Sequence, residues 1–522
     1  MKYTRLILVF IVFLTLSASA LAQEPTRLVI GYADEPDLLD VQQAFGTNFA
    51  TTDFITQALV WYSLESADVL VPDLAESYSV SPDGLTLTWV LPEGYTFSNG
   101  TSLDAAAVQA SIERYRAISP YSFDWGDLDS MQVVDARTLE TTFVVPPAYM
   151  SPVFASGFGA PFDTAAAAEA GDDAFAADPV ASGPFVLTDW TRGTEMRLTR
   201  NERYRTNLPF VTNKGPALID EVLVRFIPDP LTLIAELEAG SIDLVINVPS
   251  SAVASLQNNP DVTLTSTEYP GFQGLVFNNM RPPFDDIRFR SAIASAVDRD
   301  TLAAVLEGTV IPQRSFLSAS MVAYDPSIVA YSEEKQPYSA EQAKQFLADA
   351  GFVDSDGDGV VEKDGAPVIL EFLVASDDQR QTATSVVIQA MLQEIGIGVE
   401  IAQFDQSFIY DQMTNGEFDL AFAGYNWFDP DIMLYTYTDA GRNWPRVQNE
   451  EVARLLNEGR SVIDADARRE MYSQAQRLLI DEVAAIPLWT ELTVVANRNW
   501  VSGLLVHPVT GHLFLNDVTV NR

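Results

Sequence analysis

The sequence has no cysteine and only two histidines among its 522 residues. Without cysteine, the chain can form no disulfide, thiolate metal site, cysteine nucleophile or lipid-modified cysteine anchor. The histidines, His507 and His512, both lie in the last turn-rich stretch, and no Gly-x-Ser-x-Gly sequence occurs. This pattern disfavours a Ser-His-Asp hydrolase and a histidine-rich metal site, and we interpret each imidazole as a surface side chain. Phosphate-binding loops and dinucleotide fingerprints are also absent, so we expect no cofactor and no metal.

Positive charge is scarce in this chain. Lysine and arginine together number 31 against 72 aspartates and glutamates, which gives a formal net charge of −41. So acidic a surface would repel nucleic acid and anionic membranes. We interpret the acidity as a device for solubility, suited to a salty exterior, and not as a binding site.

The N-terminus has the three parts of a secretory signal peptide. Lys2 and Arg5 precede an apolar run over residues 6–16, and Ala20-Leu21-Ala22 follows. The apolar run is shorter than the ~20 residues that a bilayer span needs. We expect cleavage after Ala22, so that residues 1–22 are lost and a soluble monomer is exported across the cytoplasmic membrane.

Helical and strand patterns alternate along the rest of the chain, which predicts an α/β protein. Expected helices start at Ser339 with a capping box, cover 385–394, and cover 465–481 with Arg468 facing water. Expected strands cover 85–91, 368–374 and 399–404.

One acidic loop starts like a calcium-binding loop. Asp354, Asp356 and Asp358 occupy its first, third and fifth positions, and Gly359 its sixth. The twelfth position, which needs a bidentate glutamate, is Gly365. We therefore interpret the segment as a tight Asp-Gly turn and expect no metal there.

Several long stretches resemble the family 5 extracellular solute-binding proteins, the group of oligopeptide- and dipeptide-binding receptors. The most specific runs from Val71-Pro-Asp-Leu-Ala-Glu-Ser-Tyr to Ser98-Asn-Gly-Thr-Ser-Leu103. Further matches follow in the order expected for that family: Ser182-Gly-Pro-Phe-Val-Leu, Ala239-Gly-Ser-Ile-Asp-Leu, Phe277-Asn-Asn, Pro282-Pro-Phe-Asp-Asp, Leu392-Gln-Glu-Ile-Gly-Ile and Gly416-Glu-Phe-Asp-Leu. The resemblance covers nearly the whole chain after residue 22.

The resemblance implies a type II periplasmic-binding-protein fold, in which two hinged lobes close on a ligand. Lobe one would combine 24–66, 183–278 and 492–522. An extra domain, 67–182, would be inserted in lobe one, and lobe two would be 279–491.

In the peptide receptors of this family, an acid in a Gly-Trp-x-x-Asp segment holds the ammonium of the peptide. The matching stretch here is Gly424-Tyr425-Asn426-Trp427-Phe428-Asp429, in which tyrosine replaces the tryptophan and the acid comes one residue late. The residues that the resemblance assigns to ligand binding are Phe45, Gly46, Gly424, Tyr425, Asn426, Trp427, Asp429 and Trp489. The aromatic cluster around this segment adds Trp444 as a candidate.

The leading hypothesis is a receptor without catalytic activity that delivers peptides, dipeptide-like or longer, to the permease of an ABC importer. The aromatic cluster around Trp427 and the displaced acid also allow a receptor of the same fold for a sugar oligomer or another non-peptide solute. An extracellular hydrolase is the least favoured alternative.

Overall fold

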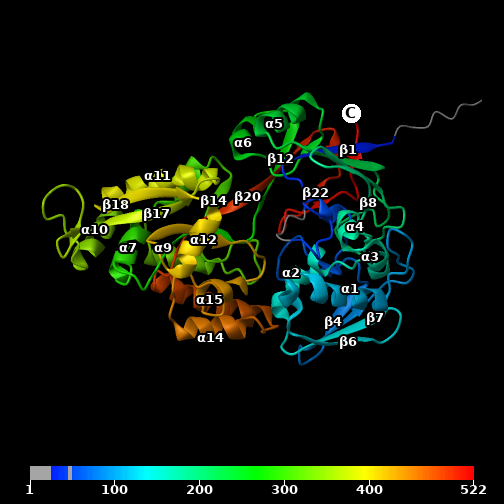
Figure 1. The fold of residues 1–522 in the computed structure, drawn as a ribbon, viewed down its shortest axis with the longest axis horizontal. Coiled ribbons are helices and arrows are strands. Elements are labelled where there is room, and N and C mark those ends of the chain that lie inside the picture. The colour runs from blue at the N-terminus through cyan, green and yellow to red at the C-terminus, as the bar shows by residue number, and fades with distance from the viewer. Residues whose placement is uncertain (1–24, 45–49) are drawn as a thin grey trace, which may run out of the picture.

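Two bodies joined by one long strand make up the molecule (Figure 1). The structure, a computed structural model, describes residues 25–44 and 50–522. The linking strand, β20 (Ile486–Arg498), lies between the yellow and orange helices of lobe two and the blue, cyan and green elements of lobe one and the extra domain. The proposed leader and two predicted site residues, Phe45 and Gly46, lie outside the described residues.

A single hydrogen-bonded sheet crosses both lobes through β20, in the order β18-β17-β19-β13-β20-β11-β1-β10-β9-β8, with β12 and β14 also paired to β20. In lobe two the strands are β18 (Gly398–Phe404), β17 (Ile369–Ala375), β19 (Leu420–Tyr425), β13 (Phe272–Phe277) and β14 (Val310–Pro312). In lobe one they are β11 (Leu244–Val245), β1 (Arg27–Tyr32), β10 (Glu221–Phe226), β9 (Glu195–Arg200), β8 (Phe185–Thr191) and β12 (Val262–Glu268).

The two halves of β20 pair with different lobes. Residues 486–491 pair antiparallel with β13 and β14, whereas residues 492–498 pair antiparallel with β12 and β11. The change of partners falls between Glu491 and Leu492, where the resemblance sets the boundary of lobe two. The division into lobes stays a prediction, and the pairing of β13 with β19 attaches residues 272–277 to the sheet of lobe two rather than to lobe one.

Helices cover both faces of the lobe two sheet, and large apolar cores fill the space on each side. Side-chain caps start the predicted helices: Ser339 accepts from the Gln342 amide at 3.2 Å, and Asp464 accepts from the Ala467 amide at 2.9 Å. The helices are α7 (Ile287–Ala296), α8 (Arg299–Val305), α9 (Ser327–Lys335), α10 (Ala340–Asp349), α11 (Gln379–Glu394), α12 (Gln406–Asn415), α13 (Ile432–Tyr437), α14 (Glu450–Gly459) and α15 (Ala465–Asp481). The predicted helices and strands of this lobe are confirmed.

The extra domain has its own antiparallel sheet in the order β4-β5-β7-β6 and its own core, which includes Trp89, Trp125 and Phe154. Its elements are β4 (Ser77–Val80), β5 (Thr86–Val90), α1 (Ala105–Ile118), β6 (Leu128–Val133), β7 (Thr138–Phe143), α2 (Ser151–Phe154), α3 (Thr164–Ala170) and α4 (Asp172–Ala177). The alternating pattern of 85–91 correctly predicted β5, whose even residues are half-buried and whose odd residues are buried.

Short elements complete lobe one, and one short strand within the predicted range of the extra domain pairs with lobe one. They are β2 (Val60–Tyr62), β3 (Leu70–Pro72), α5 (Pro230–Ala239), α6 (Ser250–Leu256), β21 (Val501–Ser502), β22 (Leu505–Val506), β23 (Leu513–Phe514) and β24 (Thr519–Val520). Among the residues described, none of the helices combines the length and the apolar character needed to cross a membrane.

Candidate functional site

A cavity of about 470 Å³ lies where lobe one, the extra domain and lobe two meet. Lobe one contributes the carboxyl ends of the parallel strands β1 and β11, where α/β proteins usually bind their ligands. The volume of the cavity falls within the roughly 300–1,000 Å³ that is typical of small-molecule sites. Its lining residues include Tyr32, Asp34, Asp53, Trp61, Phe158, Asn247, Tyr269, Asn426, Trp427, Phe428 and His512.

The segment after β19 forms the lobe two wall of this cavity. Asn426 is exposed and donates a hydrogen bond to the Tyr269 hydroxyl at 3.2 Å. The Trp427 ring is half-buried, 6.4 Å from the Phe158 ring of the extra domain, and the Phe428 ring is 5.5 Å from the Tyr62 ring. Three consecutive residues of lobe two therefore face the cavity and contact the opposite side. Of the predicted site residues, Asn426 and Trp427 line this cavity.

The charged groups of the cavity come from lobe one. Asp34 follows β1 and is exposed, while the Asp53 carboxylate accepts a hydrogen bond from His512 Nδ1 at 2.7 Å. The His512 ring packs 4.6 Å from the Trp61 ring and 4.4 Å from the Phe514 ring. The interpretation of His512 as a surface imidazole is wrong, because only 11% of its side chain is exposed.

A smaller cavity of about 240 Å³ adjoins the first and shares Asn426 and Tyr269 with it. Two further predicted site residues, Gly424 and Tyr425, line this second cavity. The Tyr425 hydroxyl donates to the carbonyl of Phe316 and is thus already engaged. The other polar side chains that line it are Gln273, Gln381, Gln406, Tyr410 and Glu491. Burial raises the pKa of the Glu491 carboxyl, against the opposing effect of Arg380, whose Nη1 lies 3.0 Å away.

Asp429, the residue predicted to hold a ligand ammonium, has another partner. Its two carboxylate oxygens accept from Arg468 Nη1 and Nη2 at 2.8 and 2.7 Å, and the residue has no exposed surface. It also accepts from the Asp431 amide at 2.9 Å, as a turn residue does. Asp429 does not line either cavity, so the carboxylate is committed to the protein interior.

The expectation that Arg468 faces water is wrong, because its side chain is paired with Asp429 in the interior and is only 4% exposed. Burial disfavours its charge, but Asp429 raises the pKa of Arg468 above its ordinary value. Nearby, burial raises the pKa of Asp431 to about 6, against the attraction of Arg460. A helical pattern cannot reveal such a buried pair, because a charged residue on one face of a helix ordinarily faces solvent.

Two predicted aromatic contacts belong to the cores of lobe two instead. Trp444 is 5% exposed, stacks on Tyr410 at 5.1 Å and donates through Nε1 to the Thr414 hydroxyl at 3.2 Å. Trp489 lies in β20, is 1% exposed and packs 5.7 Å from the Phe422 ring. Neither lines the cavities described above. The rings that line the larger cavity are those of other residues, among them Trp61, Phe158 and Trp427.

The second histidine, His507, is buried too, and its interpretation as a surface imidazole is wrong. Its Nε2 lies 3.1 Å from the Tyr62 carbonyl, and its Nδ1 accepts from the amides of Val509 and Thr510 at 3.2 and 3.3 Å. Burial lowers the pKa of His507 to about 4. The ring is thus a neutral structural group that closes a turn.

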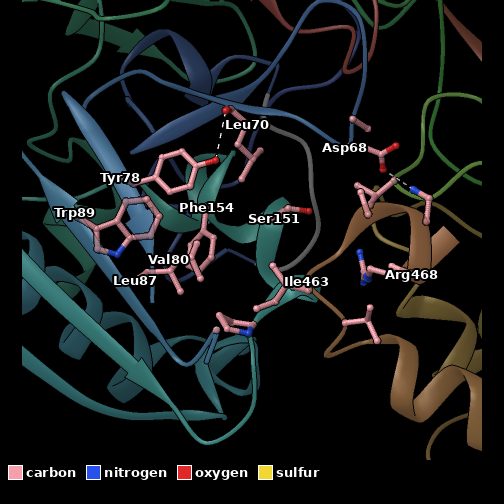
Figure 2. Close-up of a pocket in the computed structure, with 18 residues that line it drawn as sticks. Asp68, Leu70, Tyr78, Val80, Leu87, Trp89, Ser151, Phe154, Ile463 and Arg468 are labelled. Atoms are coloured by element: carbon pink, nitrogen blue, oxygen red, sulfur yellow. Dashed lines mark hydrogen bonds between the residues drawn. The ribbon is translucent and has the colours of Figure 1, made fainter. Parts of the chain in front are cut away.

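Figure 2 shows a third hollow, of about 200 Å³, between the extra domain and lobe two. Trp89, Tyr78 and Phe154 form its extra-domain side, and Ile463 and Arg468 lie on the side of lobe two. Asp68 crosses the junction, because its carboxylate accepts from the Ala323 amide at 2.8 Å and from Arg469 Nη2 at 2.7 Å. These contacts join two regions that a hinge motion would separate.

The calcium-like loop brings four carboxylates together: oxygens of Asp354, Asp356, Asp358 and Glu362 lie within 4.8 Å of one another. Glu362, at the ninth position, accepts from the amide and hydroxyl of Ser355, both at 2.7 Å. Asp354 accepts from the Gly357 and Gly359 amides, which is the hydrogen bonding of a tight turn. Exposed acidic groups of this kind are common without an ion, and the expectation of no metal stays a prediction.

Comparison with known proteins decides the family. Residues 69–444 match the model of the bacterial extracellular solute-binding proteins, family 5. The chain belongs to this family. Among relatives, a probable D,D-dipeptide-binding periplasmic protein of Escherichia coli K12 is 26% identical, with 93% of each chain covered. A heme-binding protein A of Haemophilus influenzae is 25% identical, with 85% of this chain and 83% of the relative covered.

Solved family 5 structures confirm the type II periplasmic-binding-protein fold. NikA of Brucella suis, in complex with Fe(III)-EDTA, superposes with a TM-score of 0.83 at 22% identity, covering 95% of this chain and 100% of its own. The binding protein DppA of Helicobacter pylori, in complex with peptide STSA, gives a TM-score of 0.72 at 22% identity, covering 95% and 99%. The family 5 fold thus hosts ligands as different as a peptide and a metal chelate.

Proposed function

We propose that this protein is the extracytoplasmic receptor of an ABC importer and that it captures peptides, dipeptide-like or longer, for delivery to a membrane permease. The observation that carries the proposal is the cavity between the lobes, which two predicted contacts, Asn426 and Trp427, line from lobe two. Relatives with D,D-dipeptide and di/tripeptide ligands in their names add support. The protein acts by binding and release, without chemistry.

The proposed site has two compartments. Asn426 and Trp427 contact the ligand in the larger cavity, and Gly424 and Tyr425 approach its continuation in the smaller one. Backbone groups of the segment after β19 would pair with an extended peptide as an added strand does. Aromatic rings would cover the peptide backbone at a low cost in conformational entropy. We leave Asp429, Trp444 and Trp489 out of this site because of their buried contacts.

Ring-lined cavities also suit sugar oligomers, so the ligand class has to be measured. Mass spectrometry of the small molecules that co-purify with the protein should identify peptides, and calorimetry with the identified peptide should give a single site. A carbohydrate in the extract that binds competitively would replace the peptide proposal with the sugar alternative. Peptidase and glycosidase assays should show no turnover, and intact mass should show a chain that starts near Gln23.

A further inference from the structure

The charges of the larger cavity are one-sided. Asp34 lies two residues beyond the end of β1, and no described side chain forms an ion pair or hydrogen bond with its carboxylate. Asp53 is the only other carboxylate among the described residues that line this cavity. No lysine or arginine stands among those described lining residues.

The Asp53–His512 pair has its own geometry. His512 Nδ1 is engaged by Asp53 at 2.7 Å, which fixes the orientation of the imidazole. Nδ1 thus serves Asp53, and Nε2 is the ring nitrogen left for other contacts. The side chains of the pair are 11% and 14% exposed, so each keeps only a small edge toward the cavity. A positive charge on His512 would balance only the charge of Asp53, so Asp34 keeps no counter-charge among the described residues that line the cavity.

Aromatic rings make up much of the remaining wall. Tyr32, Trp61 and Phe158 line the cavity from lobe one and the extra domain, and Trp427 and Phe428 line it from lobe two. The faces of such rings attract organic cations through their quadrupoles. The same electron-rich faces do not attract a carboxylate.

We propose that the ligand presents an ammonium group to Asp34 in this aromatic cavity, and that it carries no free carboxylate there. The inference rests on the proposed function and narrows it to a cationic peptide-like solute, such as one whose carboxyl end is blocked. An ammonium enclosed away from water requires a charge partner, and Asp34 supplies it. A ligand carboxylate in the same space would be repelled by Asp34 and Asp53.

This assignment moves the acidic partner to the opposite lobe from the one that the family motif predicts. Asp429 of lobe two is held by Arg468, whereas Asp34 belongs to lobe one. A ligand bound to Asp34 on one side and to the Asn426–Trp427 segment on the other would bridge both lobes. Closure would then depend on the cationic group directly.

Calorimetry with three matched probes tests the inference: alanyl-phenylalanine amide, free alanyl-phenylalanine and N-acetyl-alanyl-phenylalanine amide. The first is cationic, the second zwitterionic and the third neutral. We expect the amide to bind about tenfold or more tightly than either of the others. Asp34→Asn should remove about the same factor from amide binding and leave the neutral probe unaffected. Asp37→Asn is the matched control, because Asp37 is exposed on the same loop but does not line the cavity.

Each outcome has one meaning. Equal binding of the amide and its acetylated form overturns the inference and leaves the proposed function standing. Tighter binding of free alanyl-phenylalanine than of the amide also overturns the inference and leaves the proposed function standing. Loss of binding on acetylation with no effect of Asp34→Asn overturns the assignment to Asp34. If none of the three probes binds, the inference fails and the ligand is not dipeptide-like, and the proposed function then stands only if mass spectrometry of the co-purified ligand identifies a longer peptide. Thermal unfolding of both variants checks that the exposed substitutions leave the fold intact.

Discussion

The carboxylate of Asp68 in the extra domain accepts a hydrogen bond from Arg469 Nη2 in lobe two at 2.7 Å, across 401 positions of sequence. The same carboxylate accepts from the Ala323 amide of lobe two. Both partners belong to lobe two, so the two contacts connect Asp68 directly to that lobe. This side chain therefore stabilises the arrangement in which the extra domain and lobe two are in contact.

Replacing Asp68 by asparagine should shift the molecule toward separated lobes. An ion pair of this exposure and a hydrogen bond together contribute about 1–2 kcal/mol, which corresponds to about 5- to 30-fold in the equilibrium between states. Ligand affinity should fall by a comparable factor because binding then has to supply the closure. X-ray scattering of the ligand-free variant should show a larger radius of gyration. The control Asp129→Asn removes an exposed acid of the same domain and should change neither quantity.

Breaking the Asp429–Arg468 pair should destabilise the protein rather than weaken ligand binding. Asp429→Asn leaves a buried guanidinium without its charge partner, at a cost of about 3–5 kcal/mol in the free energy of unfolding. Urea denaturation measures that loss. Calorimetry on the folded variant should give the affinity of the unmodified protein. A large loss of affinity with little loss of stability would return Asp429 to the binding site.

Trp427→Ala should weaken ligand binding by about 2 kcal/mol or more, as removal of a buried aromatic anchor commonly does. Its ring lies between lobe two and the Phe158 ring, so binding should also change tryptophan fluorescence. Trp444→Phe is the matched control, because that ring packs in a core away from the cavities. Equal losses for the two variants would show that the site lies elsewhere.

Acid should destabilise the fold through His507. Its folded pKa of about 4 lies below the ordinary value of 6.5, so the unfolded chain binds a proton that the folded chain excludes. This contribution is therefore complete above pH 6.5 and declines as the pH falls toward 4, by about 1.4 kcal/mol per pH unit. Between pH 7.5 and pH 5 the variant His507→Gln should lose about 2 kcal/mol less stability than the unmodified chain. Parallel pH profiles for the two proteins would contradict the assignment.

Local patterns predicted much of the fold because their causes are local. The cap at Ser339 and the periodicity of 465–481 act within one helix, and the structure has both. The family motifs predicted the two-lobed arrangement, and the segment after β19 placed Asn426 and Trp427 in the cavity.

The cavity wall of lobe one could not be predicted in the same way. Asp53 and His512 are 459 residues apart and meet only in the folded chain. Trp489 was predicted to contact the ligand but is buried in a core, because a tryptophan in the sequence looks the same in a core as in a binding site. Arg468 lies on a helix face that the sequence predicts to be exposed, yet its charge is paired with Asp429 in the interior.

Because residues 492–498 of β20 pair with β12 and β11, which lie more than 200 residues earlier in the sequence, a single cut of the chain does not release the two lobes as independent fragments. A cut between Glu491 and Leu492 would leave β12 and β11 with an open edge in one piece, since their partner residues 492–498 would be in the other. Open edges of this kind invite pairing with other chains and aggregation. Any dissection of this protein for expression or display has to keep residues 492–498 together with β12 and β11, and a version split at Glu491 would need both pieces to be made together.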